Sequence, residues 1–195
     1  MKISIVLSSL LLGTTIFGFK YFNKSSEASA VTFSSTKSYR NHSVYLKPVG
    51  MVSVVIDKSD YELQVYDEQG WYATYPVVFG NGSLEDKKME GDRNTPEGDF
   101  HIVSKRVHDK WNRFMALDYP TRESFEKFRL RKESGEIPES ARIGGGIGIH
   151  GVWPHEDYQI DRYQNWTMGC ISMKNDDVEE FYSYAPIGTK ITIRK

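Results

Sequence analysis

Cysteine is almost absent from this sequence, since Cys170 is the only one among 195 residues. A single cysteine excludes an internal disulfide and leaves a free thiol. Positive charge is not in excess, because 25 lysines and arginines are set against 26 aspartates and glutamates, for a net charge of −1. The lack of a dominant basic patch argues against nucleic acid as a partner. No internal repeat is present, which argues against a repeat array.

The N-terminus has the pattern of an export segment. Lys2 precedes a mostly apolar run over residues 3–19, and an Ala-Ser-Ala motif follows at residues 28–30. A positive start, an apolar stretch and a small-residue site predict a secretory signal peptide over residues 1–30. The apolar run also approaches the length of a membrane span, so the alternative for residues 1–30 is an uncleaved N-terminal membrane anchor.

Two further regions follow the export segment. Residues 31–48 are polar and predict a linker. Residues 49–195 are numerous enough to form one domain with its own core. The expected localisation is export to the periplasm or cell envelope, with the membrane contacted only through the N-terminal segment.

Hydrophobic patterns over residues 49–195 predict a mainly β domain. Val52, Val54 and Ile56 alternate with polar residues, as in a strand with one buried face. Strands are predicted over six stretches: residues 52–56, 61–65, 71–79, 100–103, 143–149 and 189–194. Helices are predicted over residues 123–132 and from Asp176, where an Asp-x-x-Glu spacing resembles a capping box, to about residue 185.

Cys170 is a candidate nucleophile. A thiol becomes strongly nucleophilic only as a thiolate, and an imidazole such as that of His150 is the usual base. A lone cysteine with a histidine elsewhere in the chain therefore predicts a catalytic pair. Two alternatives stay open at this point. The cysteine could be a small buried apolar residue, or it could bind a metal with His150 and His155, although their spacing matches no zinc signature.

Three motifs follow one another along the chain. Residues 95–100 are Thr-Pro-Glu-Gly-Asp-Phe, residues 149–151 are Ile-His-Gly, and residues 166–171 are Trp-Thr-Met-Gly-Cys-Ile. In this order they resemble the catalytic domain of the bacterial cell-wall L,D-transpeptidases of the YkuD type, over roughly residues 51–194. The last motif is similar to that of a subgroup with Trp-Thr-x-Gly-Cys-Ile in place of Ser-His-Gly-Cys.

The resemblance implies a β-sandwich-like fold with a few short helices, and it implies a role for each motif residue. Cys170 would be the nucleophile and His150 the proton acceptor and donor. Gly151 would orient His150 through its backbone carbonyl, and Gly169 would supply a backbone N–H to an oxyanion hole together with Cys170. The expected substrate-binding residues flank the nucleophile: Trp166, Thr167, Met168 and Ser172.

Two positions depart from the family pattern. Met168 stands where the family usually has histidine immediately before Gly-Cys, and Ser172 stands where it often has arginine. The base expected from the resemblance, His150, is intact. The departure at Met168 therefore concerns substrate positioning and the acceptor more than activation of the thiol.

The function implied is that of a peptidoglycan L,D-transpeptidase in cell wall biogenesis or remodelling. It would act on stem tetrapeptides through an acyl-enzyme at Cys170, with no cofactor and no metal. One alternative keeps the Cys170–His150 pair and uses water, which gives an L,D-carboxypeptidase or a wall amidase. Another alternative is a non-catalytic peptidoglycan-binding module. All three have peptidoglycan stem peptides as the partner.

Several residues outside the motifs have two interpretations each. Arg93 is expected to be a solvated loop arginine or to meet a substrate carboxylate. Trp153 and Tyr158 are expected to line the cleft or simply to pack. His101 and His108 are expected at the surface.

Overall fold

The fold is taken from a computed structural model, in which residues 39–40 and 47–195 are described. The predicted export segment and nearly all of the predicted linker lie outside these residues. Across the part of the chain that the structure describes, no helix combines the length and apolar character needed to cross a membrane.

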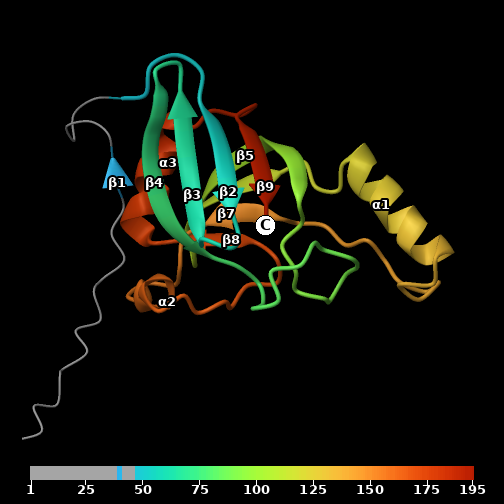
Figure 1. Ribbon diagram of the computed structural model, residues 1–195. Coiled ribbons are helices and arrows are strands. Elements are labelled where there is room, and N and C mark those ends of the chain that lie inside the picture. The colour runs from blue at the N-terminus through green and yellow to red at the C-terminus, as the bar shows by residue number, and fades with distance from the viewer. Residues whose placement is uncertain (1–38, 41–46) are drawn as a thin grey trace, which may run out of the picture. The chain divides into compact units, whose positions relative to one another are not determined.

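The described residues form a mainly β domain, which confirms the predicted fold class (Figure 1). The strands are β1 (Tyr39–Arg40), β2 (Ser53–Asp57), β3 (Glu62–Asp67), β4 (Gly70–Val78), β5 (Gly98–His108), β6 (Asn112–Leu117), β7 (Gly148–His150), β8 (Ile171–Met173) and β9 (Lys190–Arg194). The helices are α1 (Arg122–Glu133), α2 (Tyr158–Asp161) and α3 (Asn175–Tyr184).

Two long strands join two sheets into one sandwich. The first part of β4 pairs with β3, and its end pairs with β8. In the same way β5 pairs first with β9 and then with β6. Strand pairing therefore continues around β4-β3-β2-β9-β5-β6-β7-β8 and returns to β4, with β1 added beside β4. Pro76, predicted to mark an edge or a bulge, lies where β4 passes from one sheet to the other.

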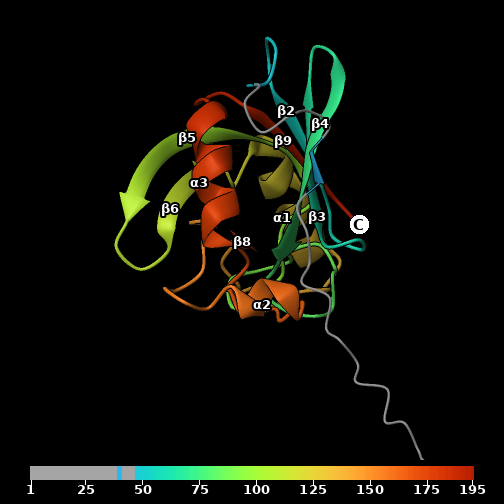
Figure 2. The same cartoon turned by 90° about the vertical axis from the view of Figure 1, so that its left-hand side faces the viewer.

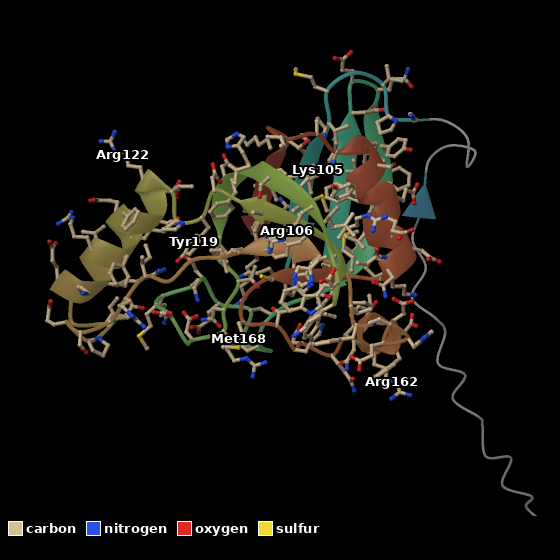
Figure 3. All side chains as sticks on the ribbon, turned by 180° about the vertical axis from the view of Figure 1, so that it is seen from behind. Lys105, Arg106, Tyr119, Arg122, Arg162 and Met168 are labelled. Carbon is tan, nitrogen blue, oxygen red and sulfur yellow. The ribbon has the colours of Figure 1, made fainter. Side chains whose placement is uncertain are left out.

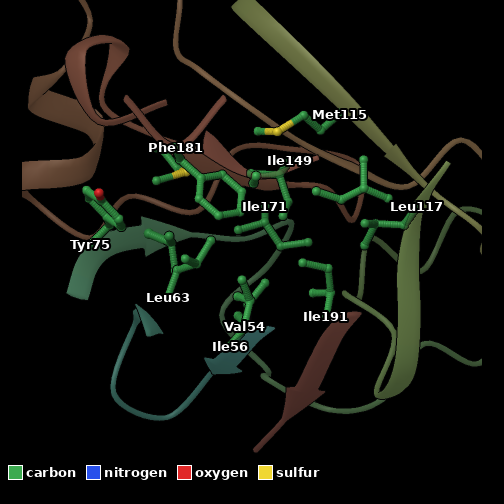
Figure 4. Close-up of a cluster of buried hydrophobic side chains, with 14 of the residues drawn as sticks. Val54, Ile56, Leu63, Tyr75, Met115, Leu117, Ile149, Ile171, Phe181 and Ile191 are labelled. Atoms are coloured by element: carbon green, nitrogen blue, oxygen red, sulfur yellow. The ribbon is translucent and has the colours of Figure 1, made fainter. Parts of the chain in front are cut away.

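The core lies between the two sheets and is closed on one side by α3 (Figures 2 and 4). Val54 and Ile56 are buried, as their alternation predicts, and Phe181 of α3 is completely buried in the same cluster. Burying an aliphatic or aromatic side chain of this size contributes about 1.5–3 kcal/mol. Other apolar side chains in this cluster include Leu63, Tyr75, Met115, Leu117, Ile149, Ile171 and Ile191.

The predicted strand over residues 143–149 is mostly wrong, since only Gly148–His150 forms a strand. Gly144 and Gly146 have φ angles of +75° and +72°, which no strand residue adopts. The segment is therefore an irregular approach to β7. The sequence patterns also gave no indication of β6, β8 or α2.

The two longer helices lie where they are predicted, and their bounds differ from the predicted ones by about one residue. Thr121 caps α1, because its hydroxyl accepts a hydrogen bond from the N–H of Ser124 at 3.2 Å. The predicted capping box at Asp176 is wrong. The helix α3 begins one residue earlier, at Asn175, and its N-cap Lys174 makes no side-chain capping bond.

A buried lysine fixes the long loop between β4 and β5. Lys58 is 1% exposed, and its ammonium lies 2.6 Å from a carboxylate oxygen of Glu97. It also donates to the carbonyl oxygens of Glu85 and Thr95, at 3.0 and 3.4 Å. One cation from the β2–β3 turn thereby holds three points of a loop that also contacts residues 166 and 167, next to Cys170.

Replacing Lys58 with methionine should lower the free energy of unfolding by about 2–3 kcal/mol, because it leaves a carboxylate and two carbonyls without their cation. The comparison is Lys190→Met, which breaks the half-exposed pair with Asp99 and should cost less than about 0.5 kcal/mol. Urea unfolding of both variants measures the difference. Equal losses would contradict a special role for the buried cation.

Candidate active site

Cys170 and His150 lie on neighbouring parallel strands. His150 ends β7, Cys170 immediately precedes β8, and the register pairs His150 with Ser172. Side chains alternate along a strand, so Cys170 projects on the same face as Ser172 and His150. Given the ordinary spacing of strands and residues, the Cα atoms of Cys170 and His150 lie on the order of 8 Å apart. A thiol and an imidazole can bridge that separation.

The carbonyl oxygen of Gly151 fixes the tautomer of His150. Nδ1 of His150 lies 2.7 Å from this oxygen, which can only accept a hydrogen bond. Nδ1 therefore carries the proton, and Nε2 keeps the lone pair that a general base needs. Ser172 donates its hydroxyl proton to the same carbonyl oxygen at 3.4 Å.

Three aromatic rings enclose the imidazole. Trp111 stacks on it with centroids 4.6 Å apart and planes 24° apart, and Phe114 lies nearly parallel at 6.0 Å. Trp166 approaches edge-on at 5.5 Å. His150 is consequently only 1% exposed. The residues that place these three rings around the imidazole are therefore part of the site.

Burial favours the neutral form of both His150 and Cys170. It lowers the pKa of His150 to about 4. It raises the pKa of the Cys170 thiol, and a hydrogen bond from the backbone of Gly148 offsets only part of that effect. The thiol donates toward the carbonyl oxygen of Gly146 at 3.5 Å. At neutral pH the resting site thus holds a thiol and a neutral imidazole.

The segment before Cys170 is held by its own threonine. Thr167 is buried, donates to the carbonyl oxygen of Cys170 at 2.8 Å and accepts the N–H of Gly169 at 3.1 Å. Both of these bonds lie inside the segment, so Thr167 shapes it. Gly169 has a φ of +123°, and a Cβ there would lie 2.8 Å from the carbonyl oxygen of Asn94. Only glycine fits that position without a shift of the neighbouring loop.

The end of β4 also holds residues 165–170, called the nucleophile segment after the role predicted for Cys170. The backbone N–H of Phe79 donates to the side-chain oxygen of Asn165 at 2.7 Å. Its carbonyl oxygen accepts the N–H groups of Trp166 and Thr167, at 3.0 and 3.2 Å. These three bonds fix the backbone just before Cys170 to a strand that belongs to both sheets.

Arg93 adds a second attachment. It is exposed, as the solvated alternative expects, but its guanidinium also bonds three backbone carbonyls. That it meets a substrate carboxylate stays a prediction. Its Nε donates to the carbonyl oxygen of Thr167 at 3.2 Å, and Nη2 donates to those of Gly80 and Trp166 at 3.0 and 3.2 Å. A guanidinium presents its donors in a fixed plane, so it can join three carbonyls at once. Arg93 thereby ties the β4–β5 loop to the nucleophile segment.

The two positions that depart from the family pattern lie in different environments. Met168 is 67% exposed and projects from the lower rim of the domain (Figure 3). Ser172 is completely buried beside Gly151, where a substrate could not reach it. Ser172 was predicted to bind substrate because it follows Cys170 closely. Strand register instead places it opposite His150.

The hairpin of β5 and β6 supplies the site residues that the sequence interpretation missed. Trp111 lies in its turn and Phe114 on β6, and both pack on His150. His108 was expected at the surface, but its ring stacks on Trp111 at 4.5 Å. Asp109 and Asn112, as turn-forming residues between β-compatible stretches, could have signalled the hairpin.

A cavity of about 550 Å³ lies beside the hairpin turn, and His108, Lys110, Val152 and His155 are among its lining residues. Trp153, exposed to 38%, lies under the ammonium of Lys110 at 5.3 Å. Among residues 39–40 and 47–195, no three histidine, cysteine or carboxylate side chains come together as metal ligands.

Comparisons with solved structures identify the fold. The helical cell shape determining protein Pgp2 from Campylobacter jejuni is 24% identical with a TM-score of 0.54, and the match covers 83% of this chain and 51% of Pgp2. Bd1075 from Bdellovibrio bacteriovorus is 18% identical with a TM-score of 0.49, over 75% of this chain and 48% of Bd1075. This chain thus spans about half the length of these proteins. None of the curated proteins compared with the chain matches it.

The sequence itself matches a protein family over most of its length. Residues 52–193 match YkuD, described as the L,D-transpeptidase catalytic domain. This range contains β2 to β8 and nearly all of β9, the enclosed His150 and the segment that carries Cys170. The chain therefore belongs to the YkuD family of L,D-transpeptidase catalytic domains.

Proposed function

We propose that this protein is a peptidoglycan L,D-transpeptidase that uses Cys170 as its nucleophile and acts in the bacterial cell envelope. The proposal rests on the placement of His150 at the end of β7 and Cys170 immediately before the neighbouring strand β8. A partly exposed thiol shares one face with a buried imidazole whose Nδ1 proton is held by the Gly151 carbonyl. Family membership supplies the substrate class, the stem tetrapeptide of peptidoglycan.

In the proposed first step the thiol attacks the carbonyl of the donor L,D-peptide bond. Nε2 of His150 takes the thiol proton as the C–S bond forms, and then gives it to the nitrogen of the departing D-amino acid. The resting pair is neutral, so the proton moves during attack rather than before it. The thioester is left on Cys170 for a second nucleophile.

The tetrahedral oxyanion needs backbone donors close to Cys170. The N–H of Gly169 already donates to Thr167, so the N–H of Cys170 is the remaining candidate from the predicted pair. Removal of one oxyanion donor typically costs on the order of 10²–10³ in rate. The bonds made by Thr167 hold the turn that presents this donor.

The acceptor decides between transpeptidase and hydrolase. An amine from a second stem peptide gives a cross-link, and water gives a shortened peptide. The family's usual histidine is replaced by Met168, whose exposed side chain offers no hydrogen-bond donor at the rim. We therefore keep the L,D-carboxypeptidase or amidase reaction as the second candidate.

Cys170→Ala should abolish both acyl-enzyme formation and turnover, because it removes the only thiol. Intact-protein mass spectrometry with a carbapenem detects the acyl-enzyme, and mass spectrometry of stem tetrapeptide products detects cross-linked or trimmed peptides. Binding to peptidoglycan sacculi is measured in parallel. A mass shift that persists in Cys170→Ala would refute the proposed nucleophile, and sacculus binding without any wild-type turnover would favour a binding module.

Arg93→Met should lower kcat by about tenfold or more, since small displacements of a reacting group can cost up to about 10²-fold. The variant keeps an apolar stem and loses two bonds to the nucleophile segment and one to Gly80. Arg142→Met is the matched control, because Arg142 is an exposed loop arginine paired with Glu90. Steady-state kinetics of both variants decide the matter. Wild-type kcat in Arg93→Met would contradict the positioning effect.

Met168→His should preserve alkylation of Cys170 and change the ratio of cross-linked to hydrolysed product. The side chain at position 168 lies at the rim, outside the rings that enclose His150, so it should affect the acceptor more than the thiol. Product ratios from a mixture of donor and acceptor peptides measure the effect. Complete loss of alkylation by iodoacetamide would show that position 168 acts on the thiol instead.

A further inference from the structure

Trp111 packs against two histidine rings. Its indole stacks with His150 at a centroid distance of 4.6 Å, and with His108 at 4.5 Å with planes only 9° apart. His150 belongs to β7, while Trp111 and His108 belong to the β5–β6 hairpin. A hairpin turn therefore covers the ring of the proposed base.

The same residue holds the peptide that orients His150. The carbonyl oxygen of Trp111 accepts the N–H of Gly151 at 3.0 Å. The carbonyl of Gly151 in turn accepts the Nδ1 proton of His150 at 2.7 Å. A Cβ on Gly151 would lie 2.9 Å from the Trp111 carbonyl oxygen, so close approach of the two backbones needs glycine there. Trp111 thus contacts the imidazole through its ring and through one intervening peptide.

The hairpin turn is itself held in place. Nδ1 of His108 accepts the N–H groups of Lys110 and Trp111, at 3.2 and 3.3 Å. The side-chain amide of Asn112 donates to the carbonyl oxygen of Asn175 at the start of α3, at 3.2 Å. The ring of Trp111 is therefore presented to His150 by a turn with local and long-range attachments.

The indole acts through its faces and not through its N–H. Nε1 of Trp111 is buried and has no hydrogen-bond acceptor among the residues that the structure describes. Stacked faces exclude water from an imidazole, which keeps it neutral at rest. The same faces attract the imidazolium that forms when the thiol loses its proton. A ring without an N–H should therefore replace much of the effect.

We propose that Trp111 is the positioning residue of His150, which it shields from water and aligns through the Gly151 peptide. This role rests on the proposed function, because it supposes that His150 is the base. Among the residues that the structure describes, the titratable and charged groups near the imidazole include His108 beside Trp111, Cys170 on the same sheet face, and Arg106, which lies over the Phe114 ring at 4.7 Å.

The test compares Trp111→Ala and Trp111→Phe in the full chain, with Trp71→Ala as the matched control. Trp71 lies on β4 and bonds Thr74 at 2.8 Å, away from His150. NMR titration of the ring C–H of His150, assigned with His150→Gln, gives its pKa. Kinetics on a stem tetrapeptide give kcat and KM, and circular dichroism verifies folding.

In Trp111→Ala the pKa of His150 should rise from about 4 toward its ordinary value of 6.5, because water reaches the ring. We expect kcat to fall about 10–100-fold, with KM changed less than about twofold. Trp111→Phe should restore most of the wild-type kcat and bring the pKa of His150 most of the way back to its wild-type value. Trp71→Ala should leave the pKa of His150 at its wild-type value. Trp111→Phe decides the question alone if Trp111→Ala does not fold.

An unchanged pKa of His150 in folded Trp111→Ala would overturn the proposal. A loss of kcat that Trp111→Phe does not restore would overturn it too. The titration needs no substrate, so it tests the role of Trp111 separately from the proposed function. If the wild type makes no product, the proposed function fails on its own. If the wild type turns over peptide while the pKa stays fixed, only the role of Trp111 fails.

Discussion

The carbonyl oxygen of Gly151 is the acceptor on which the arrangement of the site depends. It accepts hydrogen bonds from Nδ1–H of His150 at 2.7 Å and from the hydroxyl of Ser172 at 3.4 Å. Because a carbonyl cannot donate, it selects one tautomer and leaves Nε2 as an acceptor. A carboxylate in this place would add a negative charge and raise the pKa of the imidazole. A carbonyl orients the ring and allows burial to keep it neutral.

The closed strand pairing explains why that carbonyl has a fixed position. The strands β4 and β5 each belong to both sheets, so the segments that leave them start from rigid points. From β4 the chain continues to Phe79, whose backbone holds the nucleophile segment. From β5 it continues to the hairpin turn with Trp111, which holds Gly151. The thiol and the imidazole are thus each supported from a different corner of the sandwich.

The sequence predicted the mainly β fold and most core strands because the alternation of Val54 and Ile56 depends only on which face is buried. It also indicated Cys170 and His150, since their neighbours carry a family resemblance. It could not place Ser172, whose role depends on the register between β7 and β8. The sequence named Arg93 but could not give its acceptors for a similar reason, because the carbonyls of Gly80 and Trp166 are distant in sequence or carry no side-chain signal.

The glycine-rich approach to β7 shows a further limit of pattern reading. Branched residues alternate with glycine over residues 143–149, which satisfies the period of a strand. Gly144 and Gly146 instead use positive φ angles, which only the folded surroundings select. This path places the Gly146 carbonyl where it accepts a hydrogen bond from the Cys170 thiol. In a regular strand this carbonyl could instead have accepted a backbone N–H of a neighbouring strand.

Burial of the pair has a chemical consequence for a lone thiol. Oxidation and unspecific alkylation both proceed through the thiolate, so a raised pKa of Cys170 protects the sulfur at rest. The same burial makes His150 a weak base at rest. The proposed proton transfer therefore depends on a carbonyl carbon that accepts the sulfur as its proton leaves. In that mechanism reactivity is coupled to the arrival of a substrate carbonyl at Cys170, and the rings that bury His150 impose this coupling.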